Sequence, residues 1–152
     1  MFFLEENVTG LSYKNLLKRQ FFPAIKRQKA VDEYWFMQDG ATPHRTKDVF
    51  EAIFDCFDTR VIGLNYPNFA NGGLEWPPYS PDLNPLDFFF WGYLKDKVYK
   101  NNPETLSELK NAIIFEINNI DVQVLQRVIQ NFCKRLELCQ QGDGGHFEHI
   151  YV

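Results

Sequence analysis

The sequence predicts an α/β fold, in which a sheet carries packed helices and further helices follow toward the C-terminal end. Two observations predict it. Short apolar segments typical of strands alternate with amphipathic helical segments up to residue 65, and helical segments alone follow from residue 86. The 152 residues fit one domain, and an apolar content of 45% with an aromatic content of 16% is enough to bury a core.

Three predicted strands alternate with two predicted helices in the first part of the chain. The strands cover residues 1–6, 31–38 and 59–65, and the helices cover residues 9–28 and 45–57. Pro23 is expected to kink or divide the first helix. The second helix is expected to bury the side that carries Val49, Ile53, Phe54 and Phe57. Three short strands are few for a stable sheet and would leave an apolar edge open.

A long loop precedes three predicted helices. Residues 66–85 contain five prolines and two adjacent glycines, which is typical of a functional or a disordered loop. The helix over residues 86–99 is apolar around most of its circumference and is expected to be buried. Amphipathic helices are predicted over residues 103–120 and 121–139, the first capped by Asn102.

Charge and cysteine content argue against several classes of protein. A formal net charge of −4 argues against a chain that holds nucleic acid by bulk positive charge. The three cysteines form no CxxC pair, which argues against a disulfide scaffold and favours a reducing compartment. The N-terminal segment lacks the pattern of a signal peptide, and no apolar run approaches membrane-spanning length. We therefore expect a soluble, intracellular protein with no membrane partner.

Two acidic residues lie at positions that suit metal binding. Asp39 ends the strand over residues 31–38, and functional groups of α/β sheets gather at the carboxyl ends of strands. Asp87 opens the helix that follows the long loop. If that strand and helix pack together, the two carboxylates converge on a site suited to Mg²⁺ or Mn²⁺. A structural interpretation stays open for both, because Asp-Gly is a common turn dipeptide and a helix dipole favours an acid in the first turn.

Three basic or titratable residues follow Asp39 closely. His44 is a candidate to approach nucleic acid or the metal site, and a hydrogen bond at the entry of the next helix is the alternative. Arg45 and Lys47 are candidates to contact a phosphate, and a solvated start of the helix is the alternative.

Two motifs carry a more specific pattern. The first is "DGATPH" over residues 39–44, directly after a strand, and the second is "SPDLNPLD" over residues 80–87, leading into an aromatic helix. In wording, order and context they resemble the catalytic core of Tc1/mariner-type DDE transposases of the eukaryotic mobile-element branch. The resemblance is strongest over residues 34–99.

The resemblance implies an RNase H-like fold with a mixed sheet, which binds two Mg²⁺ or Mn²⁺ ions, cleaves DNA at transposon ends and transfers the strands. It assigns Asp39 as the second carboxylate of the triad and Asp87 as the third. Asp82 is the competing candidate, although it more naturally shapes the turn before the helix. It also implies a nuclear protein that integrates DNA, with homo-oligomerisation possible.

The chain departs from the family pattern in two ways. Between Asp39 and Asp87 lie 47 residues, more than in the best-known members. None of the acids before Asp39 is a credible first carboxylate, and the helix-turn-helix DNA reader is missing. We therefore expect a truncated RNase H-like core over residues 1–100, a helical extension over residues 101–152, and no activity of the chain alone. The alternative is a non-catalytic interaction module repurposed from a transposase relic.

Overall fold

The computed structural model describes residues 2–4, 7–28 and 31–144, and these form two compact units. We call Met1–Tyr79 unit one and Ser80–Val152 unit two. The predicted functional boundary after residue 100 is a different division, and it stays a prediction. None of the described helices is both long enough and apolar enough to cross a membrane.

The first helical segment of unit one confirms the prediction for residues 9–28, including its division near Pro23. Helix α1, Gly10–Leu16, and helix α2, Phe22–Ile25, are joined by a π-helical turn over Leu17–Phe21. Because proline has no N–H to donate, a regular α-helical turn would lose a hydrogen bond here, and the wider turn lies directly before it. Thr9 caps α1, since its side chain accepts a hydrogen bond from the Ser12 amide at 3.1 Å.

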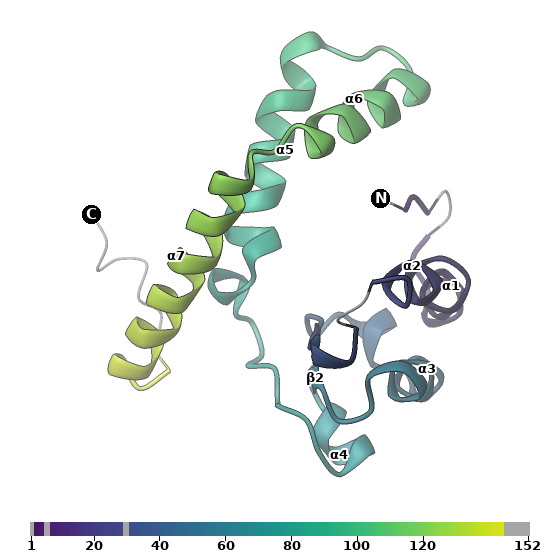
Figure 1. The fold of residues 1–152 in the computed structure, drawn as a ribbon, viewed down its shortest axis with the longest axis vertical. Coiled ribbons are helices and arrows are strands. Elements are labelled where there is room, and N and C mark those ends of the chain that lie inside the picture. The colour runs from purple at the N-terminus through teal and green to yellow at the C-terminus, as the bar shows by residue number, and fades with distance from the viewer. Residues whose placement is uncertain (1, 5–6, 29–30, 145–152) are drawn as a thin grey trace. The chain divides into compact units, whose positions relative to one another are not determined.

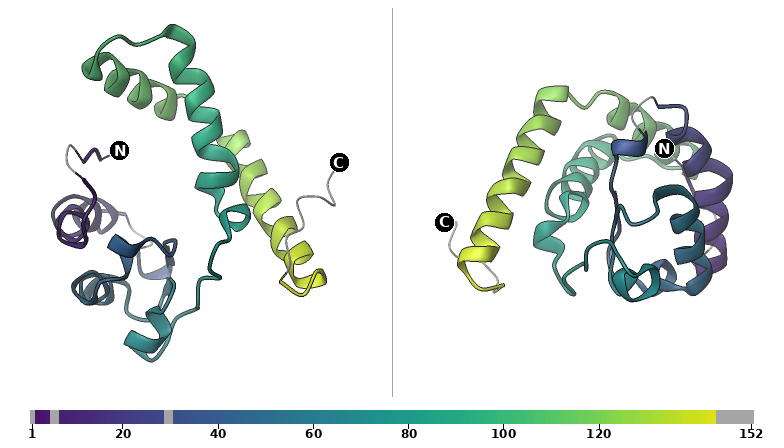
Figure 2. Two further views of the ribbon diagram at one scale, coloured as in Figure 1. Left: turned by 180° about the vertical axis from the view of Figure 1, so that it is seen from behind. Right: turned by 60° about the horizontal axis from the view of Figure 1, so that its bottom comes forward.

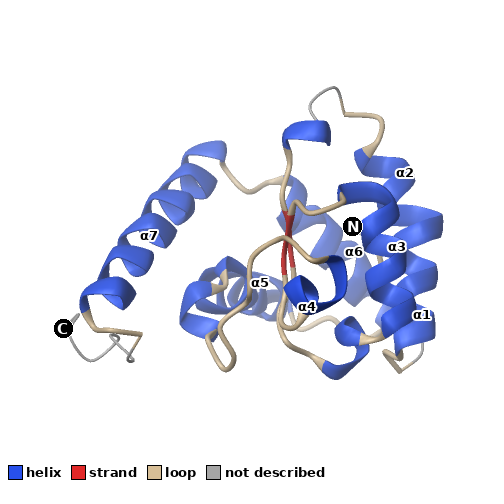
Figure 3. Cartoon of the chain, turned by 90° about the horizontal axis from the view of Figure 1, so that it is seen from below, coloured by secondary structure: helices blue, strands red, loops and turns tan. Residues whose placement is uncertain are grey.

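The sheet of the described structure has two short parallel strands. Strand β1, Phe36–Met37, pairs with strand β2, Val61–Ile62, and Leu74 adds an isolated parallel bridge to Ile62 (Figure 3). The strand predicted over residues 1–6 is wrong for residues 2–4, which have no regular structure, while residues 1, 5 and 6 lie outside the described residues. A strand exists only through its pairing, and these residues have no neighbouring strand.

Helix α3, Lys47–Phe57, supplies most of the core of unit one (Figure 1). The prediction is confirmed for three of its four apolar positions and is wrong for Phe54, which is 41% exposed. The Phe57 ring packs between two others, with centroids 5.2 Å from Phe36 and 6.1 Å from Phe22. The buried residues of this core cluster are Leu17, Phe22, Val49, Phe50, Ala52, Ile53, Phe57, Val61 and Tyr66.

The predicted loop over residues 66–85 contains more structure than expected. It begins with a short helix α4, Tyr66–Ala70, because Tyr66 is fully buried and its hydroxyl donates to the Asp58 carbonyl at 2.6 Å. Burial, and then the negative charge of Asp58, raise the pKa of Tyr66 to about 12. Gly73 follows with a φ of +89°, where a Cβ would meet the Val61 carbonyl at 2.8 Å.

Unit two is helical throughout its described part. A π-helical turn, Leu86–Phe90, leads into α5, Trp91–Val98, and α6, Leu106–Asn118, and α7, Val122–Gln141, follow (Figures 1 and 2). The segment over residues 86–99 was predicted to be buried. This is confirmed for Leu94 and Val98 and is wrong for Leu86 and Trp91, which are 48% and 44% exposed. The predicted cap of α6 is also wrong. Asn102 has a positive φ of 44°, and Thr105 caps the helix instead.

Candidate functional site

Asp39 lies just beyond the end of β1. The strand end is fixed to β2, because the Gln38 amide donates to the Ile62 carbonyl at 3.0 Å. One oxygen of Asp39, Oδ1, accepts a hydrogen bond from the Ala41 amide at 3.0 Å, so the turn-forming interpretation is confirmed. The side chain is nevertheless 43% exposed, and no described residue donates to its second oxygen, Oδ2. The turn therefore fixes the orientation of the Asp39 carboxylate through Oδ1 and leaves Oδ2 without a hydrogen bond from a described residue.

His44 orients the same carboxylate. It lies in a 3-10 turn over Thr42–Arg45, and its Nδ1 is 2.6 Å from Oδ1 of Asp39. Because a carboxylate only accepts, Nδ1 carries the proton of this hydrogen bond. The ring of Tyr13 lies against the imidazole with a centroid separation of 4.3 Å. The structure thus places His44 against the predicted metal ligand.

Two residues that were not predicted from the sequence, Gln38 and Tyr13, hold the His44–Asp39 pair in position. Gln38 is buried, and its Nε2 donates to the His44 carbonyl at 3.1 Å. Its Oε1 accepts from the Tyr13 hydroxyl at 3.3 Å. Burial, and then the negative charge of Asp39, raise the pKa of Tyr13 well above its usual range, so this hydroxyl stays a hydrogen-bond donor. A polar residue that ends an apolar strand was the only sequence signal for Gln38, and α1 gave none for Tyr13.

The two basic residues next to His44 differ in their surroundings. Lys47 opens α3 and is 79% exposed, with its Nζ 3.8 Å from an oxygen of Glu51. Arg45 is half-buried, and its Nε is buried with no hydrogen-bond partner in the part of the chain that the structure describes. Lys47 is therefore an exposed ammonium beside Glu51, whereas Arg45 is partly enclosed, and the predicted phosphate contacts of both residues stay predictions.

Asp87 lies in unit two, in the π-helical turn Leu86–Phe90, and its side chain is exposed. The Asn84 side-chain amide donates to Oδ2 of Asp87 at 2.8 Å, and the Asn84 side-chain oxygen accepts from the Leu86 amide at 3.1 Å. Asn84 therefore orients Asp87 much as His44 orients Asp39. No described residue donates to Oδ1 of Asp87, which leaves one oxygen for a cation.

Asp82, the competing acid, is placed differently. It is only 8% exposed and lies in a 3-10 turn over Pro81–Leu83. Its carbonyl accepts a hydrogen bond from Nη1 of Arg135 at 3.0 Å, and that guanidinium lies 4.4 Å from the ring centre of Phe88. The acid is thus built into the packing between the turn and α7, which favours Asp87 over Asp82 as the metal ligand of unit two.

The structure brings Asp39 and His44 together, whereas the convergence of Asp39 with Asp87 joins two units and stays a prediction. No group of three or more His, Cys, Asp or Glu side chains gathers within residues 2–4, 7–28 and 31–144. The donor set fits a hard divalent cation all the same. Each acid offers an accessible carboxylate oxygen, held in place by a neighbour that binds its other oxygen.

Comparison with known proteins gives one relative by sequence. The chain is 29% identical over 136 residues to the Transposable element Tc3 transposase of Caenorhabditis elegans. The match covers 88% of the chain and 37% of that protein, so the chain spans little more than a third of its relative. No family model matches the sequence.

Solved structures give the fold. Two structures of the catalytic domain of Mos1 mariner transposase, one with Raltegravir and Mg, match with a TM-score of 0.72. In both cases 19% of residues are identical, 95% of this chain is covered, and 67% or 66% of the other chain is covered. The predicted RNase H-like fold, present here in part, is confirmed. Of the mixed sheet that the resemblance implies, the described residues contain one parallel pair of strands.

Proposed function

We propose that this chain, a relative of the Tc1/mariner-type transposases with the fold of their catalytic domain, is part of a DDE enzyme that cleaves DNA and transfers the strands. The observation that carries the proposal is Asp39 at the carboxyl end of β1, with Oδ1 fixed by Ala41 and His44 and Oδ2 accessible. A turn-forming acid needs no buried support, whereas this one is held by His44, whose carbonyl accepts a hydrogen bond from the buried Gln38.

Asp39 and Asp87 would hold Mg²⁺ or Mn²⁺, and the metal would supply activation of a water or hydroxyl nucleophile and charge stabilisation at the phosphate. In this proposal the chain's own residues position those ligands. His44 and the Ala41 amide fix the carboxylate of Asp39, Gln38 fixes the turn that carries His44, and Asn84 fixes Asp87. A fixed carboxylate loses little side-chain entropy when it binds a cation.

DNA is the proposed substrate, bound at transposon ends in the nucleus. Lys47 offers an exposed ammonium three residues after His44, and the half-buried Arg45 adds positive charge beside it, so phosphate contacts there would bring the DNA backbone to Asp39. Because the net charge is −4, we expect these contacts to be local and sensitive to salt. Residues 1–152 supply two of three carboxylates, and we expect no cleavage by this polypeptide alone.

A chimeric enzyme tests this function. Residues 34–99 replace the matching segment of the Tc3 transposase, which supplies the first carboxylate and the DNA reader, and strand cleavage is measured in Mn²⁺. We expect Asp39→Asn and Asp87→Asn to abolish cleavage, while Asp82→Asn and the exposed control Asp48→Asn retain it. Full cleavage by the Asp39 or Asp87 variant would overturn the assignment, with circular dichroism checking that each variant folds.

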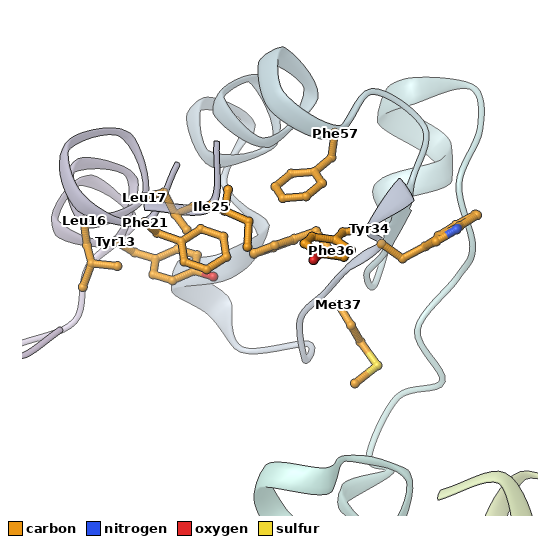
Figure 4. A pocket seen from close by; sticks show the side chains of 10 residues that line it. Tyr13, Leu16, Leu17, Phe21, Ile25, Tyr34, Phe36, Met37 and Phe57 are labelled. Atoms are coloured by element: carbon orange, nitrogen blue, oxygen red, sulfur yellow. The ribbon is translucent and has the colours of Figure 1, made fainter. Parts of the chain in front are cut away.

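A second candidate function is the interaction module, and an open apolar groove favours it. The groove, of about 420 Å³, is lined by side chains of α1, α2, the turn between them and the β1 segment, which meet across it in Figure 4. The Phe36 and Gln38 amides donate to the carbonyls of Arg60 and Ile62. The Trp35 and Met37 amides therefore point to the other edge of β1, where no described residue accepts from them. An extended apolar strand of another protein fits this edge.

A hexapeptide of alternating Val and Thr tests that alternative. Binding would shift the amide resonances of Trp35 and Met37, and Asp39→Asn would leave the shifts unchanged. Unchanged resonances at millimolar peptide would exclude the groove as a strand-binding site.

A further inference from the structure

One face of α7 carries an exposed apolar stripe with coiled-coil spacing. The apolar residues recur at intervals of 3, 4, 3, 4 and 3 residues along this 20-residue helix, which Figure 2 shows as unbroken. They are Val122, Leu125, Ile129, Phe132, Leu136 and Cys139. We call this set the α7 seam. Alternating intervals of three and four place all members along one line of the helix, as in the a and d positions of a heptad.

The α7 seam is not the face by which α7 packs inside unit two. Arg135 makes that contact, reaching the Asp82 carbonyl and the Phe88 ring. Four seam residues meanwhile remain exposed by 38% to 64%: Val122, Leu125, Ile129 and Leu136. The other two, Phe132 and Cys139, are half-buried. Exposed apolar side chains in a straight line, beside the side of α7 that packs within unit two, form a surface for another helix.

The residue types in the α7 seam select a two-stranded, parallel partner. The first two a positions hold the β-branched residues Val122 and Ile129, and the first d position holds Leu125, which is the pattern that favours parallel dimers. When the helix pairs in register with its own copy, each a or d residue packs against the same residue of the other copy. A second copy of α7 is therefore a suitable partner.

The charges of α7 also permit self-pairing. Arg127, Lys134 and Glu137 fall at outer positions of the heptad, away from the α7 seam. In a parallel pair the flanking positions join Asp121 with Gln126, Val128 with Cys133 and Arg135 with Gln140, so no like charges meet. A self-pairing helix with like charges at its flanks would repel its copy, and this one does not.

We propose that α7 pairs in parallel with α7 of a second copy of the chain, through the α7 seam. The seam is about 27 Å long, from 18 residues at about 1.5 Å each, and this is a short coiled coil. Its area lies at the small end of specific interfaces, so we expect a dimer that forms at about micromolar to tens of micromolar protein.

Light scattering after size exclusion tests the surface, from about 5 to about 200 µM protein in a reducing buffer. The wild-type chain should pass from monomer to dimer over this range. Ile129→Glu places a charge in the central layer and should weaken dimerisation at least about tenfold. Gln130→Glu adds the same charge one residue away on the polar face and should leave it unchanged. Circular dichroism checks that all three retain their helices.

Single-cysteine variants test the parallel register. Cys139 occupies a d position, so two copies in register bring its thiols within reach of a disulfide, which the oxidant diamide forms by taking up the two hydrogens. The variant Cys56→Ser/Cys133→Ser, which keeps Cys139, should cross-link. The variant Cys56→Ser/Cys139→Ser, which keeps Cys133, should not, because the two copies of this flanking residue lie on opposite sides of a parallel pair.

Each of these measurements has an outcome that overturns the proposed dimer or its parallel register. A wild-type chain that stays monomeric at the highest concentration overturns the proposal, as does a dimer that survives Ile129→Glu. A dimer that Ile129→Glu abolishes but that cross-links through Cys133, or through neither cysteine, overturns the parallel register.

Discussion

Replacing Gln38 by Met removes the buried support of the His44–Asp39 pair while keeping the length of the side chain. Gln38 holds two groups, the His44 carbonyl at 3.1 Å and the Tyr13 hydroxyl at 3.3 Å, and the substitution leaves both without that partner. A buried polar group left unsatisfied costs about 1–3 kcal/mol. The longer hydrogen bond, from the Tyr13 hydroxyl, contributes less, and burial of the apolar Met thioether offsets part of the lost stability. We expect the free energy of unfolding of unit one to fall by about 2 kcal/mol.

Native-state hydrogen exchange of the slow amides of α3 measures this change, because α3 supplies most of the core of unit one. Tyr13→Phe removes only the weaker bond and should cost less than about 1 kcal/mol. The double variant Gln38→Met/Tyr13→Phe should lose about 1 kcal/mol less unfolding free energy than the two single variants lose in sum. The reason is that Tyr13→Phe removes the hydroxyl that Gln38→Met alone would leave without a partner. Gln20→Met, an exposed glutamine, is the matched control. Equal stability of the Gln38 and Gln20 variants, or strict additivity, would refute the proposed network.

Three further predictions concern other parts of the fold. Because folding raises the pKa of Tyr66 from about 10 to about 12, its contribution to stability is complete below pH 10 and is lost as the pH rises toward 12. Urea unfolding should therefore give a lower free energy of unfolding at pH 11 than at pH 8, and Tyr66→Phe should reduce this difference. Gly73→Ala should destabilise the fold by more than about 2 kcal/mol in thermal unfolding, because φ is positive and the added Cβ would meet the Val61 carbonyl. Gly92→Ala, at an open position within α5, should instead stabilise the fold by up to about 1 kcal/mol. Arg135→Met should lower the hydrogen-exchange protection of α7 by about 1–2 kcal/mol, since it removes the hydrogen bond to the Asp82 carbonyl and the contact with Phe88, and an unchanged α7 would contradict that role.

Local chemistry could be predicted from the sequence, and long-range contacts could not. The helical spacing of Val49, Ile53 and Phe57 predicts the buried face of α3, and the Asp39-Gly40 dipeptide predicts the turn that the structure shows. Both depend on residues close together in the chain. The Tyr13–Gln38 contact joins residues 25 positions apart, and no periodic pattern signals it.

Two wrong predictions share a physical reason. Asn102 and Thr105 are both good helix caps, and the choice between them depends on where the preceding turn ends; Asn102 takes a positive φ there, which leaves the cap to Thr105. The segment 31–38 looks like a long strand by composition, but only Phe36–Met37 pairs, since a strand extends only as far as its neighbour. Composition therefore predicts the type of an element better than its limits.

The central claim is that Asp39 and Asp87 hold divalent metal at one site, and a Mn²⁺ titration followed by NMR tests it most directly. Paramagnetic broadening should affect the amides of Gly40 and Ala41 at the same Mn²⁺ concentration as those of Asp87 and Phe88, and Asp39→Asn should weaken both responses together. Asp48→Asn, at an acid paired with Lys14 in unit one, is the control and should change neither. Broadening of the two sets at different concentrations, or an Asp87 response that Asp39→Asn leaves unchanged, would contradict a shared site.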